Sequence, residues 1–160
     1  MEKPPTQKTI ATNRRARYEY HILENFECGL VLHGYEVKSV REGRVNIQDA
    51  YGIVRGDEAY VENMHITPYS HGDQRVIDPL RTRKMLLRRK EIAYLVGKTR
   101  ERGLALIPLR LYLKGPRVKL EIGLARGKKL YDKREDIAAR DAKRDIERAT
   151  RGRAKFRDRG

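Results

Sequence analysis

The sequence is poor in cysteine and in long apolar runs. Cys28 is the only cysteine among the 160 residues, so no intrachain disulfide can form. This usage is typical of a reducing compartment, and we expect a cytoplasmic protein. No apolar run approaches the roughly 20 residues that a membrane-spanning helix needs. The N-terminal segment MEKPPTQKTIATNRRAR lacks the apolar central region of a signal peptide. We therefore expect no membrane association.

The sequence also lacks the residue spacings that metal sites and common catalytic sites require. None of the four histidines stands at ligand spacing from another histidine or from the cysteine. The tetrapeptide VGKT (96–99) resembles the end of a phosphate-binding loop, but Ile92 stands where that motif requires glycine. The carboxylates form no pair suited to acid–base catalysis. We therefore expect no metal, no cofactor and no enzymatic activity.

Positive charge is what the chain has in excess. It holds 37 Lys and Arg against 22 Asp and Glu, which gives a formal net charge of +15. Residues 126–160 hold 14 Lys and Arg and 7 Asp and Glu, so this segment carries +7 of the net charge of +15. Such a charge favours an anionic polymer or an anionic surface as partner. Nucleic acid comes first and a membrane surface second, because no basic amphipathic helix with a strong apolar face is recognisable. Because tyrosines lie among the basic clusters and no zinc module or sequence-reading helix is recognisable, we expect RNA rather than DNA.

Apolar residues alternate with polar ones over much of the chain. Even-numbered apolar positions between Ala16 and Leu32 predict a strand, with a bend or bulge at Gly29. Two apolar stretches within 47–66 flank the turn residues 55–57, which is the pattern of a β-hairpin. These segments favour a mainly β domain.

The clearest pattern is LRLYLKGPRVKLEIGL, residues 109–124. It predicts a hairpin with its turn at 114–116, one buried face and one wet, mostly basic face. Leu109 and Leu111 are expected on the buried face and Tyr112 on the wet one.

Two other segments concern helices. Residues 35–42 have helical spacing of valines but are too short for a firm assignment. Asp78 and Pro79 form a typical helix start, so we expect a helix from there to Gly97 or Gly103.

Short antiparallel strands around one interposed helix predict an OB-fold-like closed barrel of about six strands with packed helices. We expect a flexible leader over 1–12, an RNA-binding barrel over 13–130, and a basic C-terminal tail over 131–160. The tail has few large apolar residues and no apolar stripe. We expect it to be disordered when free and to become ordered on a polyanion.

Two carboxylates stand in apolar or basic surroundings, Glu27 and Glu36. Two roles fit them: each can orient a neighbouring arginine, or accept hydrogen bonds from RNA base edges and 2′-hydroxyls. The sequence alone leaves both open.

Five motifs occur in order between residues 13 and 134: NRRARYEYHI, FECGLVLHGYEVKSVREGRVNIQDAY, NMHITPY, DPLRTRKMLLRRKEI and GKKLYDKR. Together they resemble the small protein B family, the SsrA-binding proteins that serve transfer-messenger RNA (tmRNA, or SsrA RNA) in bacterial ribosome rescue. Departures are slight: Cys28 stands where alanine is common, and Met85 where leucine is common. The resemblance implies an OB-like barrel without catalysis that binds the tRNA-like domain of tmRNA and delivers it to stalled ribosomes for trans-translation.

Matching the family's RNA-contacting positions, residue by residue, implies two groups. The RNA-binding group is Asn13, Arg14, Arg15, Glu27, Lys38, Arg41, Asn46, Arg83, Lys84, Leu86, Lys128 and Lys129. The group implied for the decoding centre and the tail is Tyr131, Asp132, Lys133, Arg134, Ile137, Arg140, Lys143, Arg144, Arg148 and Arg151. For Tyr131, stacking on a ribosomal RNA base and packing on the barrel both remain open.

The resemblance implies tmRNA and the ribosome as partners. The tail, residues 131–160, would enter the 16S rRNA decoding centre and the empty mRNA channel and become helical there. Elongation factor Tu and alanyl-tRNA synthetase would associate through tmRNA, and the protein itself is expected to be a monomer. The alternatives are a ribosomal structural protein with a basic extension or another RNA-binding OB-fold protein. An RNA-processing enzyme is a further alternative, for which the sequence offers no acid–base or metal constellation.

Overall fold

The computed structural model describes residues 7–68, 78–101, 103–128 and 144. The chain divides into two compact units, Met1–Gly127 and Lys128–Gly160. The first unit is the barrel described below. In the second, Lys128 directly follows the last strand, and Arg144 is helical and exposed. The expected behaviour of the tail over 131–160 otherwise lies outside the described residues.

The described elements alternate between strands and short helices. They are β1 (Gln7–Thr12), α1 (Ala16–Glu19), β2 (Tyr20–Leu30), α2 (Gly34–Arg41), β3 (Val45–Asn46), β4 (Tyr51–Arg55), β5 (Glu58–Glu62), β6 (His65–Ile66), β7 (Arg83–Leu86), α3 (Arg89–Thr99), β8 (Leu104–Lys114) and β9 (Arg117–Gly127).

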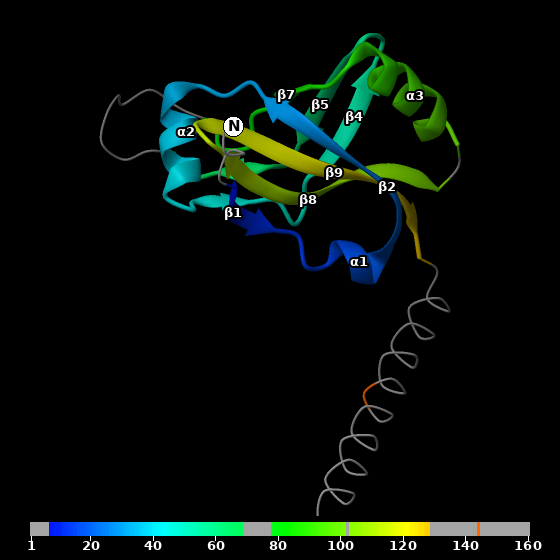
Figure 1. Cartoon of the computed structure of the whole chain (residues 1–160), viewed down its shortest axis with the longest axis horizontal. Helices are drawn as coiled ribbons and strands as arrows, with labels where there is room; N and C mark the ends of the chain where they lie inside the picture. The colour runs from blue at the N-terminus through cyan, green and yellow to red at the C-terminus, as the bar shows by residue number, and fades with distance from the viewer. Residues whose placement is uncertain (1–6, 69–77, 102, 129–143, 145–160) are drawn as a thin grey trace, which may run out of the picture. The chain divides into compact units, whose positions relative to one another are not determined.

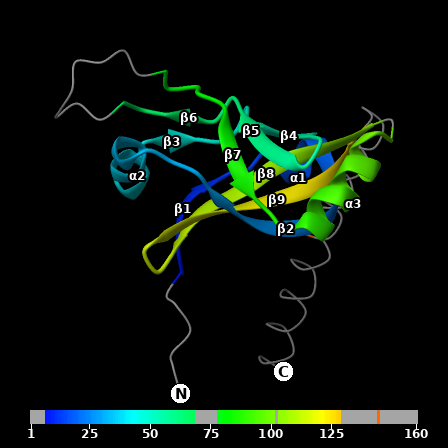
Figure 2. The same cartoon turned by 90° about the horizontal axis from the view of Figure 1, so that it is seen from above.

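Six strands close into an antiparallel barrel in the order β8-β4-β5-β7-β2-β9, and β9 pairs back onto β8. Strand β1 pairs with β8 as an addition, and β3 and β6 form a separate two-stranded sheet. Helices α2 and α3 lie at opposite ends of the barrel (Figures 1 and 2). The predicted mainly β fold with a closed, OB-like barrel of about six strands is confirmed.

Both predicted hairpins are present, and each turns on a glycine. Gly115 (φ 59°) and Pro116 join β8 to β9. Gly56 (φ 58°) begins the turn between β4 and β5. A positive φ is costly for a residue with a Cβ, and glycine at the first turn position matches the twist of the flanking strands.

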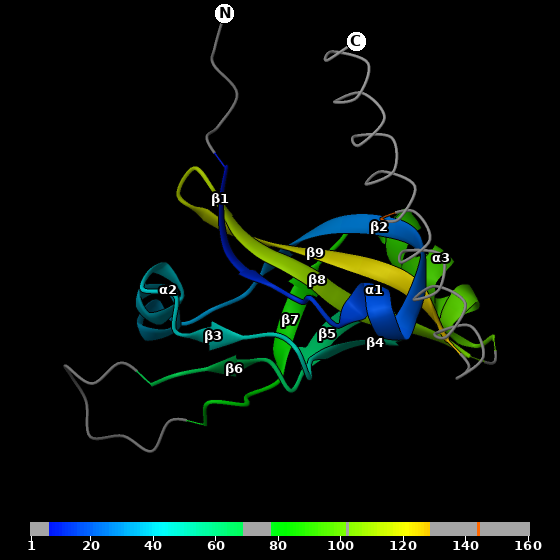
Figure 3. The same ribbon diagram turned by 90° about the horizontal axis from the view of Figure 1, so that it is seen from below.

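Strand β8 serves two apolar clusters because of one irregularity. Its register with β9 shifts between Pro108 and Arg110. Proline has no N–H for the ladder and is typical of bulges. Leu111 therefore belongs to the main core, whereas Leu109 packs in a second cluster with Ala16 of α1. The expectation that the two leucines share a face is wrong for this reason, and Figure 3 shows α1 beside β8 and β9.

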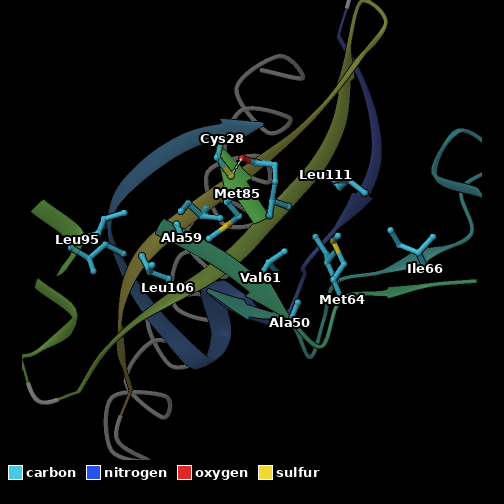
Figure 4. Close-up of a cluster of buried hydrophobic side chains, with 14 of the residues drawn as sticks. Cys28, Ala50, Ala59, Val61, Met64, Ile66, Met85, Leu95, Leu106 and Leu111 are labelled. Carbon is cyan, nitrogen blue, oxygen red and sulfur yellow. Dashed lines mark hydrogen bonds between the residues drawn. The ribbon is translucent and has the colours of Figure 1, made fainter. Parts of the chain in front are cut away.

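The main core fills the barrel (Figure 4), and every barrel strand except β4 contributes a buried member, while Val54 of β4 packs against it partly buried. Its buried members are Cys28, Val40, Ile47, Ala50, Ala59, Val61, Met64, Ile66, Met85, Leu95, Leu106, Leu111, Leu120, Ile122 and Leu124.

The predicted helix start is wrong. Asp78 instead forms a turn, in which its Oδ1 accepts the Leu80 N–H at 2.9 Å. The alternation of buried residues from Arg83 places β7 between that turn and α3. Helix α3 begins at Arg89, and the Glu91 carboxylate accepts the N–H of the N-cap residue Arg88 at 3.0 Å.

Three further expectations are corrected near the N-terminus. Residues 7–12 of the predicted leader form β1, because β8 offers an edge for pairing there. Ala16–Glu19 is helical rather than extended, since Ala16 packs into the second cluster. The irregularity of β2 lies between Ile22 and Glu24 instead of at Gly29.

The ambiguous segment 35–42 is helical and belongs largely to α2.

Within the described segments, no helix is both long enough and apolar enough to span a membrane.

Candidate nucleic-acid interface

The outer face of β2 and β7 brings together three of the predicted RNA-binding residues, Glu27, Lys84 and Leu86. Leu86 is 53% exposed, an unusual position for a large apolar side chain. It pairs in register with Gly29, and a Cβ added there would lie 3.4 Å from the Leu86 Cβ. Because side chains alternate along a strand, Glu27 and Gly29 share one face of β2, as Lys84 and Leu86 share one face of β7. The Leu86 side chain, lying against Gly29, thus forms an exposed apolar surface that we call the Leu86 ledge. The Glu27 carboxylate and the Lys84 ammonium group lie on the same face.

Glu27 has a partner on each carboxylate oxygen. The Tyr112 hydroxyl donates to Oε2, and the Lys114 Nζ lies 3.2 Å from Oε1. The hydrogen bond from Tyr112 lowers the pKa of Glu27 below its usual value. Burial opposes this to a smaller extent, and Lys114 lowers the pKa further. Glu27 is thus an ionised, oriented acceptor.

Tyr112 is only 2% exposed, so the expectation of a wet face is wrong at this residue. The Arg110 guanidinium lies 4.1 Å from the centroid of its ring and covers it. Burial raises the pKa of Tyr112, and its hydrogen bond to Glu27 raises it further. The phenol therefore remains a neutral donor.

Lys84 reaches a second carboxylate on the neighbouring strand. Its Nζ lies 3.2 Å from Glu58 Oε1, and the Tyr60 hydroxyl donates to the other oxygen. The hydrogen bonds from Tyr60 and Lys84 lower the pKa of Glu58. The Lys84 and Glu58 side chains are 42% and 47% exposed, and an ion pair in such a place contributes little to stability. An RNA phosphate can therefore replace Glu58 as the partner of Lys84 with little loss of free energy.

Arg83 is not available to RNA, which corrects its prediction as an RNA-binding residue. Its side chain is 1% exposed. Its Nε lies 2.5 Å from Glu36 Oε2, and its Nη1 donates to the Met64 carbonyl at 2.5 Å. Arg81 Nη2 donates to Glu36 Oε1 at 2.5 Å. Of the two roles open to Glu36, orienting arginines is the one observed.

Asn13 has a structural role, and its predicted RNA contact stays a prediction, since its Oδ1 has no hydrogen-bond partner. It is 6% exposed. Its backbone N–H donates to the Leu109 carbonyl at 2.8 Å, and its Nδ2 donates to the Pro108 carbonyl at 3.0 Å. These bonds anchor the turn from β1 into α1. The neighbouring Arg14 and Arg15 are exposed, as an RNA contact requires.

The remaining predicted RNA-binding residues on the barrel are exposed at its α2 end. Lys38 and Arg41 project from α2, and Asn46 lies in β3. Asn46 Oδ1 accepts the Gln48 N–H at 2.9 Å, which leaves its amide NH₂ to donate.

The rest of the predicted set follows the barrel. Lys128 is half-buried directly after β9, and Arg144 is exposed. The others lie outside the described residues: Lys129, Tyr131, Asp132, Lys133, Arg134, Ile137, Arg140, Lys143, Arg148 and Arg151.

Sequence reasoning missed the support beneath Glu27. Tyr112 and Lys114 lie 85 and 87 residues away along the chain. No local pattern reports such a pairing. The contact arises because β9 pairs with both β2 and β8, which brings Glu27 of β2 close to Tyr112 and Lys114 of β8.

Among the described residues, no three His, Cys, Asp or Glu side chains gather closely enough to hold a metal ion.

The chain is similar to proteins of one family along most of its length. The family model described as "SmpB protein" matches residues 10–152. An SsrA-binding protein of Desulforudis audaxviator is 55% identical over 154 residues, which cover 96% of this chain and 100% of that protein. One from Gloeobacter violaceus is 56% identical over 151 residues, with coverage of 94% and 99%.

A solved structure gives the same result in three dimensions. It is described as "tmRNA-SmpB: a journey to the center of the bacterial ribosome". The matched chain has a TM-score of 0.64 and 40% sequence identity, covering 84% of this chain and 95% of that one.

Proposed function

The chain belongs to the SmpB protein family, and on this basis we propose that it is an RNA-binding adaptor which binds the tRNA-like domain of tmRNA and delivers it to stalled ribosomes for trans-translation. The RNA carries both the aminoacylated end and the coding segment, so the protein needs no catalytic site of its own. Its tasks are to hold the RNA and to report that the ribosome is stalled.

The observation that carries the proposal is the outer face of β2 and β7. Leu86 offers an exposed apolar surface for a base or ribose, and Glu27 beside it is an oriented acceptor. A carboxylate repels phosphate, so within a chain of net charge +15 it fits a donor on a base edge or a 2′-hydroxyl. Lys84, Lys38 and Arg41 supply cations for phosphates on neighbouring surfaces.

The second task falls to residues 131–160 in this proposal. Asp132, Lys133 and Arg134 act in the decoding centre, and the basic residues beyond them follow the mRNA channel. Ordering a backbone costs about 1–2 kcal/mol per residue, which contacts with rRNA phosphates must offset. A channel filled by mRNA offers no such contacts. The tail would thereby sense an empty channel through folding coupled to binding.

Other associations follow from the RNA. Elongation factor Tu and alanyl-tRNA synthetase would be recruited by the aminoacylated tRNA-like domain, with this protein as a monomer beside them. The site of action would be the cytoplasm, where ribosomes translate.

The proposal is tested by crosslinking the protein to RNA in cells and sequencing the bound species. We expect one dominant RNA with tRNA-like and coding parts, together with 16S rRNA from stalled ribosomes. Recovery of rRNA alone, with equal amounts of the protein on all ribosomes, would instead identify a ribosomal structural protein. Cleavage of labelled RNA by the pure protein with divalent metal would indicate an enzyme.

A further inference from the structure

We propose that Tyr112, Lys114 and Arg110 are positioning residues that hold the Glu27 carboxylate as a fixed acceptor for a hydrogen-bond donor of the RNA. The donor is a base N–H or a ribose 2′-hydroxyl. This inference rests on the proposed function and adds to it the device that makes one carboxylate useful on a basic surface.

The geometry fixes the carboxylate at both ends. Tyr112 donates to Oε2 from β8, and Lys114 approaches Oε1 at 3.2 Å from the end of the same strand. A carboxylate has about four acceptor positions, so each Glu27 oxygen retains capacity for a further donor. Because the side chain is 39% exposed, that capacity faces solvent.

Tyr112 is itself held in place. Arg110 covers its ring at 4.1 Å, Arg110 Nη1 lies 3.2 Å from Thr9 Oγ1 on β1, and Arg110 Nη2 lies 3.5 Å from Glu121 Oε2 on β9. Three strands thus determine where the phenol hydroxyl points. Little freedom remains for Glu27 to lose when RNA binds, which is the usual basis of preorganised recognition.

The burial of Tyr112 is not explained by the apolar core. The ring is 2% exposed, yet it belongs to neither of the two apolar clusters. It lies on the outer face of the sheet, under Arg110 and against Glu27. A large buried side chain outside the core, whose hydroxyl donates to a partly exposed carboxylate, indicates support of a surface site.

The surroundings select a donor that arrives with a phosphate backbone. Lys119 stands opposite Tyr112 in β8 and opposite Gly29 in β2, so positive charge lies beside the Leu86 ledge. Phosphates are attracted to Lys114 and Lys119, while the ionised Glu27 accepts only from N–H or O–H groups.

The test is a double-mutant cycle with the whole protein and the isolated tRNA-like domain of tmRNA. Tyr112→Phe keeps the ring and Arg110 stacking but removes the donor. We expect the Kd to rise about three- to ten-fold, the range of one hydrogen bond. Adding Tyr112→Phe to Glu27→Ala should cause no further loss. The slope of log Kd against log salt should stay unchanged, because no cation is removed.

Tyr51→Phe is the matched control. The Tyr51 hydroxyl donates to Glu62 Oε2 at 2.7 Å on the outer face of β4 and β5, so the same atom is deleted from a similar pair. We expect its Kd to equal that of the unmodified protein. Equal losses for the two Phe variants, or additive losses of Tyr112→Phe and Glu27→Ala, would overturn the proposal.

A second variant separates position from charge. Glu27→Asp keeps the charge at an exposed site but draws the carboxylate back from Tyr112 and Lys114. We expect it to bind as weakly as Glu27→Ala, and wild-type affinity would contradict a positioning role. If the unmodified protein does not bind the RNA at all, it is the proposed function that fails.

The two kinds of donor are distinguished with modified RNAs. Single 2′-deoxy substitutions remove one ribose donor each, and single base analogues that lack one exocyclic amino group or one ring N–H remove one base donor each, at every nucleotide in turn. We expect one of these RNAs to abolish the difference between the unmodified protein and Glu27→Ala. If every RNA preserves that difference, Glu27 contacts no RNA donor and the proposal is wrong.

Discussion

Arg83 and Glu36 form a buried ion pair that joins β7 to α2, with Nε 2.5 Å from Oε2. The two side chains are 1% and 2% exposed. Both are otherwise satisfied: Arg83 donates to the Met64 carbonyl and Glu36 accepts the His33 N–H at 2.9 Å. The pair therefore fixes the α2 end of the barrel, from which Lys38 and Arg41 project.

Removing one partner of this pair should be costly. Arg83→Met leaves the buried Glu36 carboxylate with Arg81 as its one remaining cationic partner, and we expect the free energy of unfolding to fall by about 3–5 kcal/mol. Urea unfolding followed by circular dichroism measures this. Arg44→Met is the control, because its pair with Glu42 is solvent-exposed and should contribute less than about 1 kcal/mol. Similar losses in both variants would mean that burial does not decide the contribution.

The free energy of unfolding should also depend on pH through the titration of Glu36. Burial raises its pKa, but hydrogen bonds from the His33 N–H, Arg81 and Arg83 outweigh this and hold the pKa below its usual value of 4.5. A lowered folded-state pKa means that the unfolded chain binds the proton more readily. The contribution is therefore complete above pH 4.5 and is lost as the pH falls through the folded-state value. In Glu36→Gln, denaturant midpoints measured from about pH 6 to about pH 3 should fall less steeply, and an unchanged slope would rule this out.

Gly52 of β4 faces the core where a side chain does not fit. A Cβ there would lie 2.8 Å from the Leu106 Cβ and 3.2 Å from the Met85 Cε. We expect Gly52→Ala to lose about 1–3 kcal/mol by overpacking. Gly97→Ala is the control, since a Cβ at this position in α3 meets nothing within 4 Å. It should gain up to about 1 kcal/mol of helix propensity. Thermal unfolding of both variants gives the comparison, and a neutral Gly52→Ala would mean that β4 can shift.

Lys128 and Lys129 are expected to bind RNA phosphates after the end of β9. Replacing both with alanine should weaken binding and reduce the log–log salt slope by roughly 0.7–0.9 for each phosphate that a lysine no longer neutralises. Filter binding of the tRNA-like domain across several salt concentrations provides the slope. Arg117→Ala, at the opposite end of β9, changes the same kind of charge and serves as a control. A weaker affinity with an unchanged slope would place the two lysines away from the RNA backbone.

The two tasks of the protein should separate at the tail. A chain that ends at residue 135 retains the whole barrel, so we expect its affinity for the tRNA-like domain to change less than about three-fold, within the effect of one hydrogen bond. Peptide tagging on stalled ribosomes should be abolished, because the proposed function requires residues 136–160 to become ordered in the mRNA channel. Translation extracts programmed with an mRNA lacking a stop codon measure tagging. Parallel loss of binding and tagging would show that the tail also holds the tRNA-like domain.

The strand pattern of the sequence predicted the barrel because alternation reports directly which face is buried. It failed where tertiary contacts decide. Asp78 carries a helix-start signal, yet the buried Arg83 and Met85 require β7 to follow it. Leu109 lies in an alternating run, but the irregularity after Pro108 turns it to the second cluster.

For the candidate site, too, the sequence predicted some residues correctly and failed where tertiary contacts decide. Residue types and family likeness led to the exposed Leu86 and the half-buried Lys84. They also led to Arg83, whose partner Glu36 lies 47 residues away. A basic residue in a strand reads alike from the sequence whether it faces solvent or a buried carboxylate. The support of Glu27 by Tyr112 was likewise invisible, because two strands distant in sequence create it.

Cys28 has a practical consequence for labelling the protein. Its thiol is 1% exposed and donates to the Leu120 carbonyl at 3.2 Å, and burial raises its pKa to about 12. Thiolates, rather than thiols, react with maleimides. A cysteine introduced on the tail or on α2 would therefore be labelled almost alone, with no need to remove the native one. Pairs of fluorophores could then follow the tail on the ribosome in a chain whose interior is unaltered.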